Sequence, residues 1–327
     1  MTLYSFRRLA VAGAAALAAL ASVPALGQAW PAKPVKFVVP FPPGGSVDPL
    51  ARLVGAKLSD ALGQQFVIEN KPGASGSIGT ALVAKSPPDG YTFVVVFDSH
   101  GVNPSLIQNM PFDTLKDLAP VMLVGTAPYA IATAASKPYK TLADVVQAAK
   151  AKPDTISFGS VGNGTMGHLA MTLIQQAGGY KLIHIPYKGG GPMSADAIGG
   201  QLELAVGSVA VLSQHVRGGK LRAVAVTGEK RSGTMPDVPT LAEQGVPGIT
   251  AYAYWAILAP AATPRPIIDR LNAELGKALR LPDLNKQLTE QLGMDLMIST
   301  PEALQKWTVD EIARWGKVIR DGGIKAD

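Results

Sequence analysis

The chain contains no cysteine among its 327 residues, and this absence excludes several kinds of chemistry. Without a thiol the protein has no disulfide, no thiolate metal ligand, no cysteine nucleophile and no site for an N-terminal lipid tether. Charged residues make up only 17% of the chain, and no cluster of Lys and Arg is typical of a nucleic-acid surface. We therefore expect a fold stabilised by burial, with no nucleic-acid partner.

Long apolar runs are also scarce, and the chain has one of note, at residues 9–20. Arg7 and Arg8 precede this run, Pro24 breaks it, and small residues follow it. This order predicts a secretory signal peptide over residues 1–29, cleaved after Gly27 or Ala29. The run is too short to span a bilayer of about 30 Å, which disfavours the alternative of a membrane anchor. We expect a periplasmic, soluble mature chain, whose net charge falls from +6 to +4 when the two arginines leave with the leader.

The rest of the chain alternates apolar strand-like runs with stretches of helical periodicity. The helix after Pro42–Gly45 has Ser46 at its expected N-cap and Gly63 at its end. Strands are predicted at 35–41, 66–69, 92–97, 156–161, 181–187, 202–209 and 221–227. Helices are predicted at 47–62, 80–85, 142–150, 166–177, 194–198, 267–279 and 301–319. This alternation predicts an α/β fold with parallel sheets covered by helices on both faces.

Two apolar stretches, residues 121–135 and 249–259, do not fit the alternation and are interpreted as crossovers between two α/β domains. Domain I is then formed by residues 30–127 and 246–327, and domain II, residues 128–245, is inserted in it. A cleft between two such domains is a common ligand site. Trp255, in the second crossover, either lines that cleft or packs between the domains.

Four glycine-rich loops stand immediately before predicted helices. They are residues 42–46 (PPGGS), 72–77 (PGASGS), 162–167 (GNGTMG) and 187–192 (YKGGGP). The third fits the dinucleotide fingerprint, but that motif also needs an acidic residue about 20 positions later, and none is present. A helix N-terminus attracts anions through its free N–H groups, so the loops favour a small carboxylate; the alternative is four ordinary turns.

No catalytic or metal-binding arrangement is evident. The four histidines, His100, His168, His184 and His215, are scattered, and neither a His-x-x-x-His pair nor a Gly-x-Ser-x-Gly elbow occurs. We predict no catalytic residue, no metal and no cofactor. Asp98 and Ser99, at the end of a predicted strand, are either part of a ligand site or a solvated strand end.

At these motifs the chain resembles the Bug family of tripartite tricarboxylate transporter receptors. The resemblance extends over essentially the whole mature chain, with the motifs in order. They are residues 30–35 (WPAKPV), 38–45 (VVPFPPGG), 69–74 (ENKPGA), 88–92 (PDGYT), 103–106 (NPSL), 162–165 (GNGT), 186–189 (PYKG), 219–223 (GKLRA) and 236–240 (PDVPT).

The resemblance implies a periplasmic binding protein fold of the second type, in which two α/β domains close around a ligand by a hinge. Family ligands are small organic acids, including dicarboxylates, amino acids and aromatic acids. The ligand-binding residues implied by motif are Pro43, Gly44, Ser46, Asp48, Ala74, Ser75, Gly164, Thr165 and Tyr187. Asp48 is awkward as a direct anion contact, so we expect it to cap the helix or order the loop.

Two positions depart from many relatives and bear on the ligand. A carboxylate at Asp98 is expected to pair with a ligand amine, to accept from a hydroxyl, or to repel a second ligand carboxylate. We therefore add Asp98 and Ser99 to the expected site. Ala256 stands where a glycine after an aromatic residue is common, and we expect its methyl group to narrow the cleft.

The sequence thus predicts a monomeric receptor that captures a small carboxylate and delivers it to membrane transporter subunits. Two alternatives remain: a receptor for a signalling partner, which also works by closure, and an exported α/β hydrolase with a reactive serine and one of the four histidines.

Overall fold

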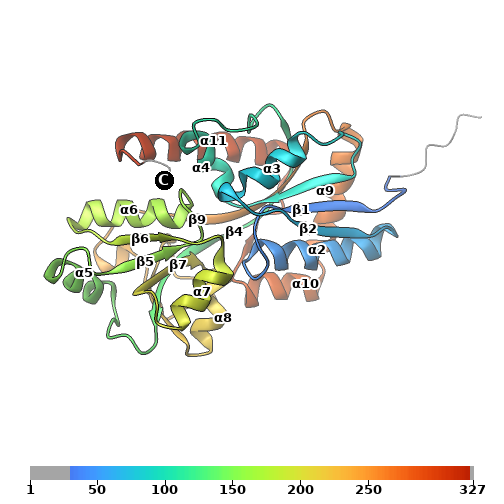
Figure 1. Ribbon diagram of the computed structural model, residues 1–327. Helices are drawn as coiled ribbons and strands as arrows, with labels where there is room; N and C mark the ends of the chain where they lie inside the picture. Colours follow the sequence, from blue (N-terminus) through green and yellow to red (C-terminus); the bar gives the residue numbers. More distant parts are fainter. Residues whose placement is uncertain (1–29, 325–327) are drawn as a thin grey trace, which may run out of the picture.

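The computed structural model describes residues 30–324. The predicted signal peptide, residues 1–29, lies outside the described residues. Helices pack on both faces of a mixed, strongly elongated sheet (Figure 1). None of the helices within residues 30–324 combines the length and the hydropathy needed to cross a membrane.

The strands occur close to their predicted positions. They are β1 (Val35–Val39), β2 (Phe66–Asn70), β3 (Thr92–Val96), β4 (Leu118–Ala134), β5 (Ser157–Ser160), β6 (Ile183–Pro186), β7 (Leu204–Ser208), β8 (Leu221–Val226), β9 (Tyr252–Pro260) and β10 (Asp295–Leu296). The main path through the sheet is β2-β1-β3-β9-β4-β7-β5-β6, with β8 and β10 also paired to β4.

The helices follow the apolar spacing of the sequence. The α-helices are α2 (Val47–Leu62), α3 (Ser77–Ala84), α4 (Ser99–Leu106), α5 (Leu142–Ala151), α6 (Met166–Gly178), α7 (Gly190–Ile198), α8 (Val209–Arg217), α9 (Arg265–Leu279), α10 (Pro282–Lys286) and α11 (Pro301–Asp321). Shorter helical turns are η1 (Ala74–Gly76), η2 (Ala242–Gln244) and η3 (Gln287–Gln291). Helix α2 has its predicted bounds, and Gly63 ends it in the left-handed conformation, with φ of 66°.

Both predicted crossovers are long strands, and this corrects the expectation of purely parallel sheets. Strand β4 pairs antiparallel with β9 over residues 118–128 and then with β7 and β8 over residues 129–134. We call β1, β2, β3, β9, β10 and the first part of β4 sheet A. We call β5, β6, β7, β8 and the last part of β4 sheet B. The pairs β1–β2, β1–β3, β5–β6 and β5–β7 are parallel. The sheets are mixed because a strand that leaves one sheet for the other runs against its neighbours.

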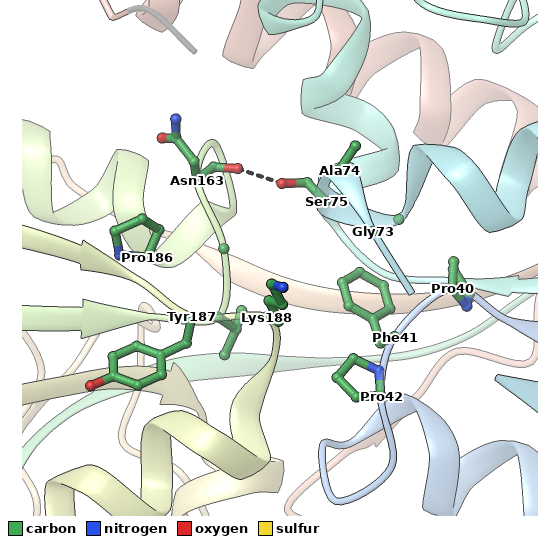
Figure 2. A pocket seen from close by; sticks show the side chains of 13 residues that line it. Pro40, Phe41, Pro42, Gly73, Ala74, Ser75, Asn163, Pro186, Tyr187 and Lys188 are labelled. Atoms are coloured by element: carbon green, nitrogen blue, oxygen red, sulfur yellow. Dashed lines mark hydrogen bonds between the residues drawn. The ribbon is translucent and has the colours of Figure 1, made fainter. Parts of the chain in front are cut away.

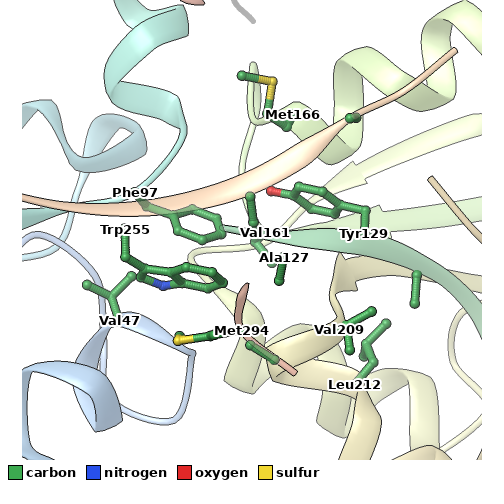
Figure 3. Packing of buried hydrophobic residues seen from close by; sticks show 14 of the residues in the cluster. Val47, Phe97, Ala127, Tyr129, Val161, Met166, Val209, Leu212, Trp255 and Met294 are labelled. Atoms are coloured by element: carbon green, nitrogen blue, oxygen red, sulfur yellow. The ribbon is translucent and has the colours of Figure 1, made fainter. Parts of the chain in front are cut away.

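Three of the largest buried side chains, Trp255, Tyr129 and Tyr254, belong to β4 and β9, the strands that pass between the sheets. Trp255 on β9 is fully buried, and its ring centroid lies 5.4 Å from that of Phe97. Figure 3 shows both rings beside Val47, with Tyr129 of β4 further along. Trp255 Nε1 donates to Ser46 Oγ over 3.2 Å, so this core side chain also positions the loop before α2. Of the two roles considered for Trp255, the structure has the packing one.

We predict that Trp255→Ala lowers the free energy of unfolding by about 3–5 kcal/mol, because it leaves a cavity beside Phe97 and a hydroxyl without its donor. Urea unfolding followed by far-UV circular dichroism measures the change. Trp255→Phe keeps an aromatic ring and should cost clearly less. A loss below about 1 kcal/mol in Trp255→Ala would contradict this account of the core.

Candidate functional site

A cavity of about 170 Å³ lies between sheets A and B, where four loops meet (Figure 2). Two of the loops follow β1 and β2 of sheet A, and two follow β5 and β6 of sheet B. The carboxyl ends of parallel strands are the usual ligand edge of an open α/β sheet. The lining residues are Pro40, Phe41, Pro42, Gly73, Ala74, Ser75, Gly76, Val161, Gly162, Asn163, Pro186, Tyr187 and Lys188.

Each of the four loops that line the cavity leads into a helix. The helices are α2, α3, α6 and α7. The first amides of a helix have no partner inside the helix, and the helix dipole adds positive potential there. Asp48 lies in the first turn of α2, but the ion pair with Arg52 offsets its charge. The field at the cavity therefore favours an anion.

The turn before α3 is held in an unusual backbone conformation. Gly73, Ala74, Ser75 and Gly76 all have positive φ, with 45° at Ala74 and 50° at Ser75. Such conformations cost free energy in non-glycine residues and persist where the surroundings enforce them, often at functional sites. Here Ser99 Oγ and Asn103 Nδ2, both on α4, donate to Ser75 O over 2.7 Å and 3.1 Å. The expected site residue Ser99 thus positions this turn instead of lining the cavity.

A hydrogen bond joins the two walls of the cavity. Ser75 Oγ, from the sheet A side, donates to Asn163 O, from the sheet B side, over 2.7 Å (Figure 2). Ala74 and Ser75 line the cavity, as expected. Asn163 also lines it, although the sequence argument did not single it out. The described conformation is therefore one in which the walls are in contact.

The loop over residues 162–165 is fixed from within sheet B. Thr165 is fully buried, and its Oγ1 donates to Gly162 O over 2.8 Å. The Gly164 amide donates to His168 Nδ1 over 3.2 Å. Gly164 has a φ of +69°, which strains any other residue, and a Cβ there would also displace the end of the Leu106 side chain of α4, 2.1 Å away. Gly164 and Thr165 shape the wall without lining the cavity.

The loop before α2 meets the loop before α7 at backbone distance. A Cβ on Gly191 would lie 3.3 Å from Pro43 O and from the carbonyl of Gly44. Pro43 and Gly44 are thus contact points between the sheets, outside the cavity lining. Ser46 lines a much smaller neighbouring cavity of about 20 Å³. It stands at the expected N-cap, but its hydroxyl accepts from Trp255 and makes no cap bond.

Asp48 has the ordering role expected of it. Besides Arg52 it accepts from Asn70 Nδ2, which also donates to Phe41 O. Because Phe41 lines the cavity, Asp48 and Asn70 together fix one wall.

Tyr187 and Lys188 follow strand β6 and line the cavity on the sheet B side. The Tyr187 hydroxyl donates to Asp196 Oδ2 over 2.7 Å, and its ring points away from the cavity centre (Figure 2). Lys188 lies between Tyr187 and Phe41 in the same view and is the charged residue of the lining. The sequence argument quoted Lys188 within its motif but did not select it. Its place directly before the glycines that open α7 was the available signal.

The comparisons with known proteins agree with this architecture. The model of the tripartite tricarboxylate transporter family receptor matches residues 50–324. The chain belongs to this family. BugT of Bordetella pertussis is 37% identical over 321 residues, which cover 98% of each chain. The family is one of periplasmic solute-binding receptors and not of enzymes, so this protein is a receptor.

Solved structures of relatives have the same fold. An R. palustris protein with adipate is 34% identical, with a TM-score of 0.87, and the match covers 90% of this chain and 99% of that one. MatC from Rhodopseudomonas palustris with bound malate is 30% identical, with a TM-score of 0.84, over 89% of this chain and all of MatC.

Asp98 of the receptor is not where the sequence argument expected it. The residue is fully buried and absent from the cavity lining, and Tyr129 Oη donates to its Oδ2. Burial raises the pKa of Asp98 well above its usual range. In this structure Asp98 lies outside the cavity lining, and its bond to Tyr129 joins the end of β3 to strand β4.

We predict that Asp98→Asn leaves ligand affinity within about threefold, because a neutral side chain of the same shape keeps the contact with Tyr129. Asp98→Ala should lower the free energy of unfolding by about 1–3 kcal/mol, since it leaves the buried Tyr129 hydroxyl without an acceptor. Calorimetric titration and urea unfolding measure the two effects. An affinity that collapses in Asp98→Asn would restore the ligand-contact interpretation.

The serine and histidine that the hydrolase alternative requires are close together but unsuited to catalysis. Ser160 Oγ lies 2.8 Å from His184 Nε2, yet Ser160 is fully buried and its Oγ donates to Gly162 O. A hydroxyl has one proton, so Gly162 O and His184 Nε2 compete for it, and the buried Ser160 presents no accessible nucleophile to a substrate. Within residues 30–324, no group of three or more His, Asp or Glu could hold a metal ion.

His184 and His168 stack with ring centroids 3.9 Å apart beside the 162–165 loop. Burial, with repulsion from His168, lowers the pKa of His184 to about 3 from 6.5. Between these values the unfolded chain binds more protons at this residue than the folded chain does. The stability that neutral His184 contributes is therefore present above about pH 6.5 and is lost as the pH falls toward 3.

We predict that His184→Gln, which keeps a donor for Ser160, loses less thermal stability than the unmodified receptor on acidification from about pH 7 to about pH 4.5. The difference between the melting temperatures of the variant and the unmodified receptor isolates His184. The contributions of buried His100 and of Asp98, which have opposite signs, are the same in both proteins and cancel. Differential scanning calorimetry measures the difference. If the melting temperatures of the two proteins fell equally over this pH range, His184 would not be the source of the acid sensitivity.

Proposed function

We propose that this receptor captures a small organic carboxylate between sheets A and B and delivers it to the membrane subunits of a tripartite tricarboxylate transporter. The observation that carries the proposal is the meeting of four loops, each leading into a helix, at one cavity whose lining contains Lys188 and no acidic side chain. Carboxylates are among the anions that such backbone sites hold. The adipate and malate in the relatives' structures support the same class of ligand.

Closure of the two halves is the proposed binding event. The strand pairing of β4 changes partners between Pro128 and Tyr129, which supports a division into residues 30–127 with 246–327 and an inserted unit of residues 128–245. The contact between Ser75 and Asn163 and the approach of Gly44 to Gly191 then form across the closed cleft. A closed cleft excludes water and strengthens each polar contact to the ligand.

The proposal extends to location and assembly. Residues 1–29 act as a signal peptide that exports the chain to the periplasm, where the receptor works as a monomer. Ser75 and Asp48 act on the loops that hold the ligand, together with Ala74, Gly164, Thr165 and Tyr187. The membrane subunits bind the closed form, because only closure reports that the cleft is filled.

We predict that an organic acid which fits the cavity raises the melting temperature of the mature receptor. At about 100 times its Kd, a ligand that binds only the folded state adds about 2.7 kcal/mol of stability. A thermal-shift panel of mono-, di- and tricarboxylates, aromatic acids and amino acids identifies the class. A folded, ligand-free receptor that no acid stabilises would refute carboxylate capture.

We predict that Gly191→Val weakens ligand binding at least tenfold, because its side chain collides with the backbone of residues 43–44 only when the halves close. The melting temperature without ligand should stay nearly unchanged. Gly233→Val is the matched control, since a Cβ there meets nothing within 4 Å. Equal affinity in the two variants would argue against closure at this contact.

A further inference from the structure

The electrostatics of the cavity come from two different sources on opposite walls. On the sheet A side, Gly73, Ala74 and Ser75 offer backbone N–H groups and no charged side chain, whereas the amides of Gly76 and Ser77 donate within the turn. On the sheet B side, Lys188 supplies a full positive charge. Among the residues that line the cavity, Lys188 is the sole ionisable side chain apart from Tyr187, whose hydroxyl is already bound to Asp196.

Lys188 is free to meet a ligand. Its side chain is exposed, and within residues 30–324 it forms no ion pair or hydrogen bond. Many other lysines of the chain are paired: Lys36 and Lys71 with Glu69, for example, and Lys137 with Glu203. No protein ion pair has to be broken before this ammonium pairs with a ligand, so an anionic ligand group competes only with water for it.

The two sources are suited to two anionic groups. One carboxylate satisfies the backbone donors on the sheet A side and cannot at the same time neutralise an ammonium on the other wall. The cavity, about 170 Å³, is smaller than a typical drug site, so it fits a short molecule that bridges the walls. A monocarboxylate of the same length would place a methyl group near Lys188.

We infer that Lys188 pairs with a second anionic group of the ligand and makes the receptor prefer dicarboxylates to monocarboxylates of equal chain length. This inference rests on the proposed capture of a carboxylate. The lysine ammonium is a compact charge on a flexible stem with three donors, so it follows the second carboxylate to different positions. The preference therefore holds for dicarboxylates of more than one length.

Calorimetric titration of four probes tests the inference: succinate against butyrate, and adipate against hexanoate. The unmodified receptor should bind at least one dicarboxylate ten or more times as tightly as its monocarboxylate partner, a difference of about 1.4 kcal/mol. In Lys188→Met this ratio should fall below about threefold, through loss of dicarboxylate affinity alone. Lys188→Arg keeps the charge and should keep most of the preference.

Lys181→Met is the matched control, because Lys181 is an exposed lysine at the other end of β6 and does not line the cavity. It removes the same net charge and should leave the ratio unchanged. The preference of the unmodified receptor should also weaken in higher salt, and that of Lys188→Met should not. Thermal midpoints of the variants show that each one is folded.

Three results would overturn the inference. Equal affinities for the two members of each pair would show that no second anionic group is recognised, while carboxylate capture would stand. An unchanged dicarboxylate preference in Lys188→Met would show that another residue recognises the second carboxylate, and carboxylate capture would again stand. No binding of any probe, with no stabilisation by any acid of the panel, would remove the proposed function together with the inference.

Discussion

The pairing of one strand with two sheets is the constraint on which the rest of this structure depends. Strand β4 pairs with β9 over its first part and with β7 and β8 over its last, so a single extended backbone sets where sheet B lies relative to sheet A. The buried side chains of Trp255 on β9 and Tyr129 on β4 pack where these strands pass between the sheets and hold the two sheets in place. The loops after β1, β2, β5 and β6 then meet at one cavity, although more than 100 residues separate the first from the last.

The cavity is built by backbone geometry more than by reactive side chains. Hydroxyl groups such as those of Ser99 and Thr165 hold the loops by donating to carbonyls, and Asp48 acts through Asn70. This arrangement leaves helix amides to face a ligand. A site of preorganised donors with little charge suits reversible binding, because nothing in it needs to be consumed or regenerated. The family to which the chain belongs works as receptors, in keeping with this chemistry.

Part of the fold was readable from local pattern, and part was not. The bounds of α2 follow from its apolar spacing and from Gly63, and the strands β1 to β3 lie within a residue or two of their predicted positions. Helix α4 was missed because its sequence, SHGVNPSL, has little helical periodicity and contains Pro104. The crossovers were located by their composition, but their antiparallel pairing depends on contacts between distant segments, which no local signal encodes.

For this protein, the sequence by itself determined the family, the alternation of strands and helices and the glycine-rich loops before helices, because each depends on residues close together in the chain. Tertiary structure alone decided which side chains face the cavity. Asp98 and Lys188 both follow strands and both have ionisable side chains, yet Asp98 is buried against Tyr129 whereas Lys188 lines the cavity. The difference arises from how loops of one sheet pack on those of the other, and side-chain direction at such a contact is set only when both are in place.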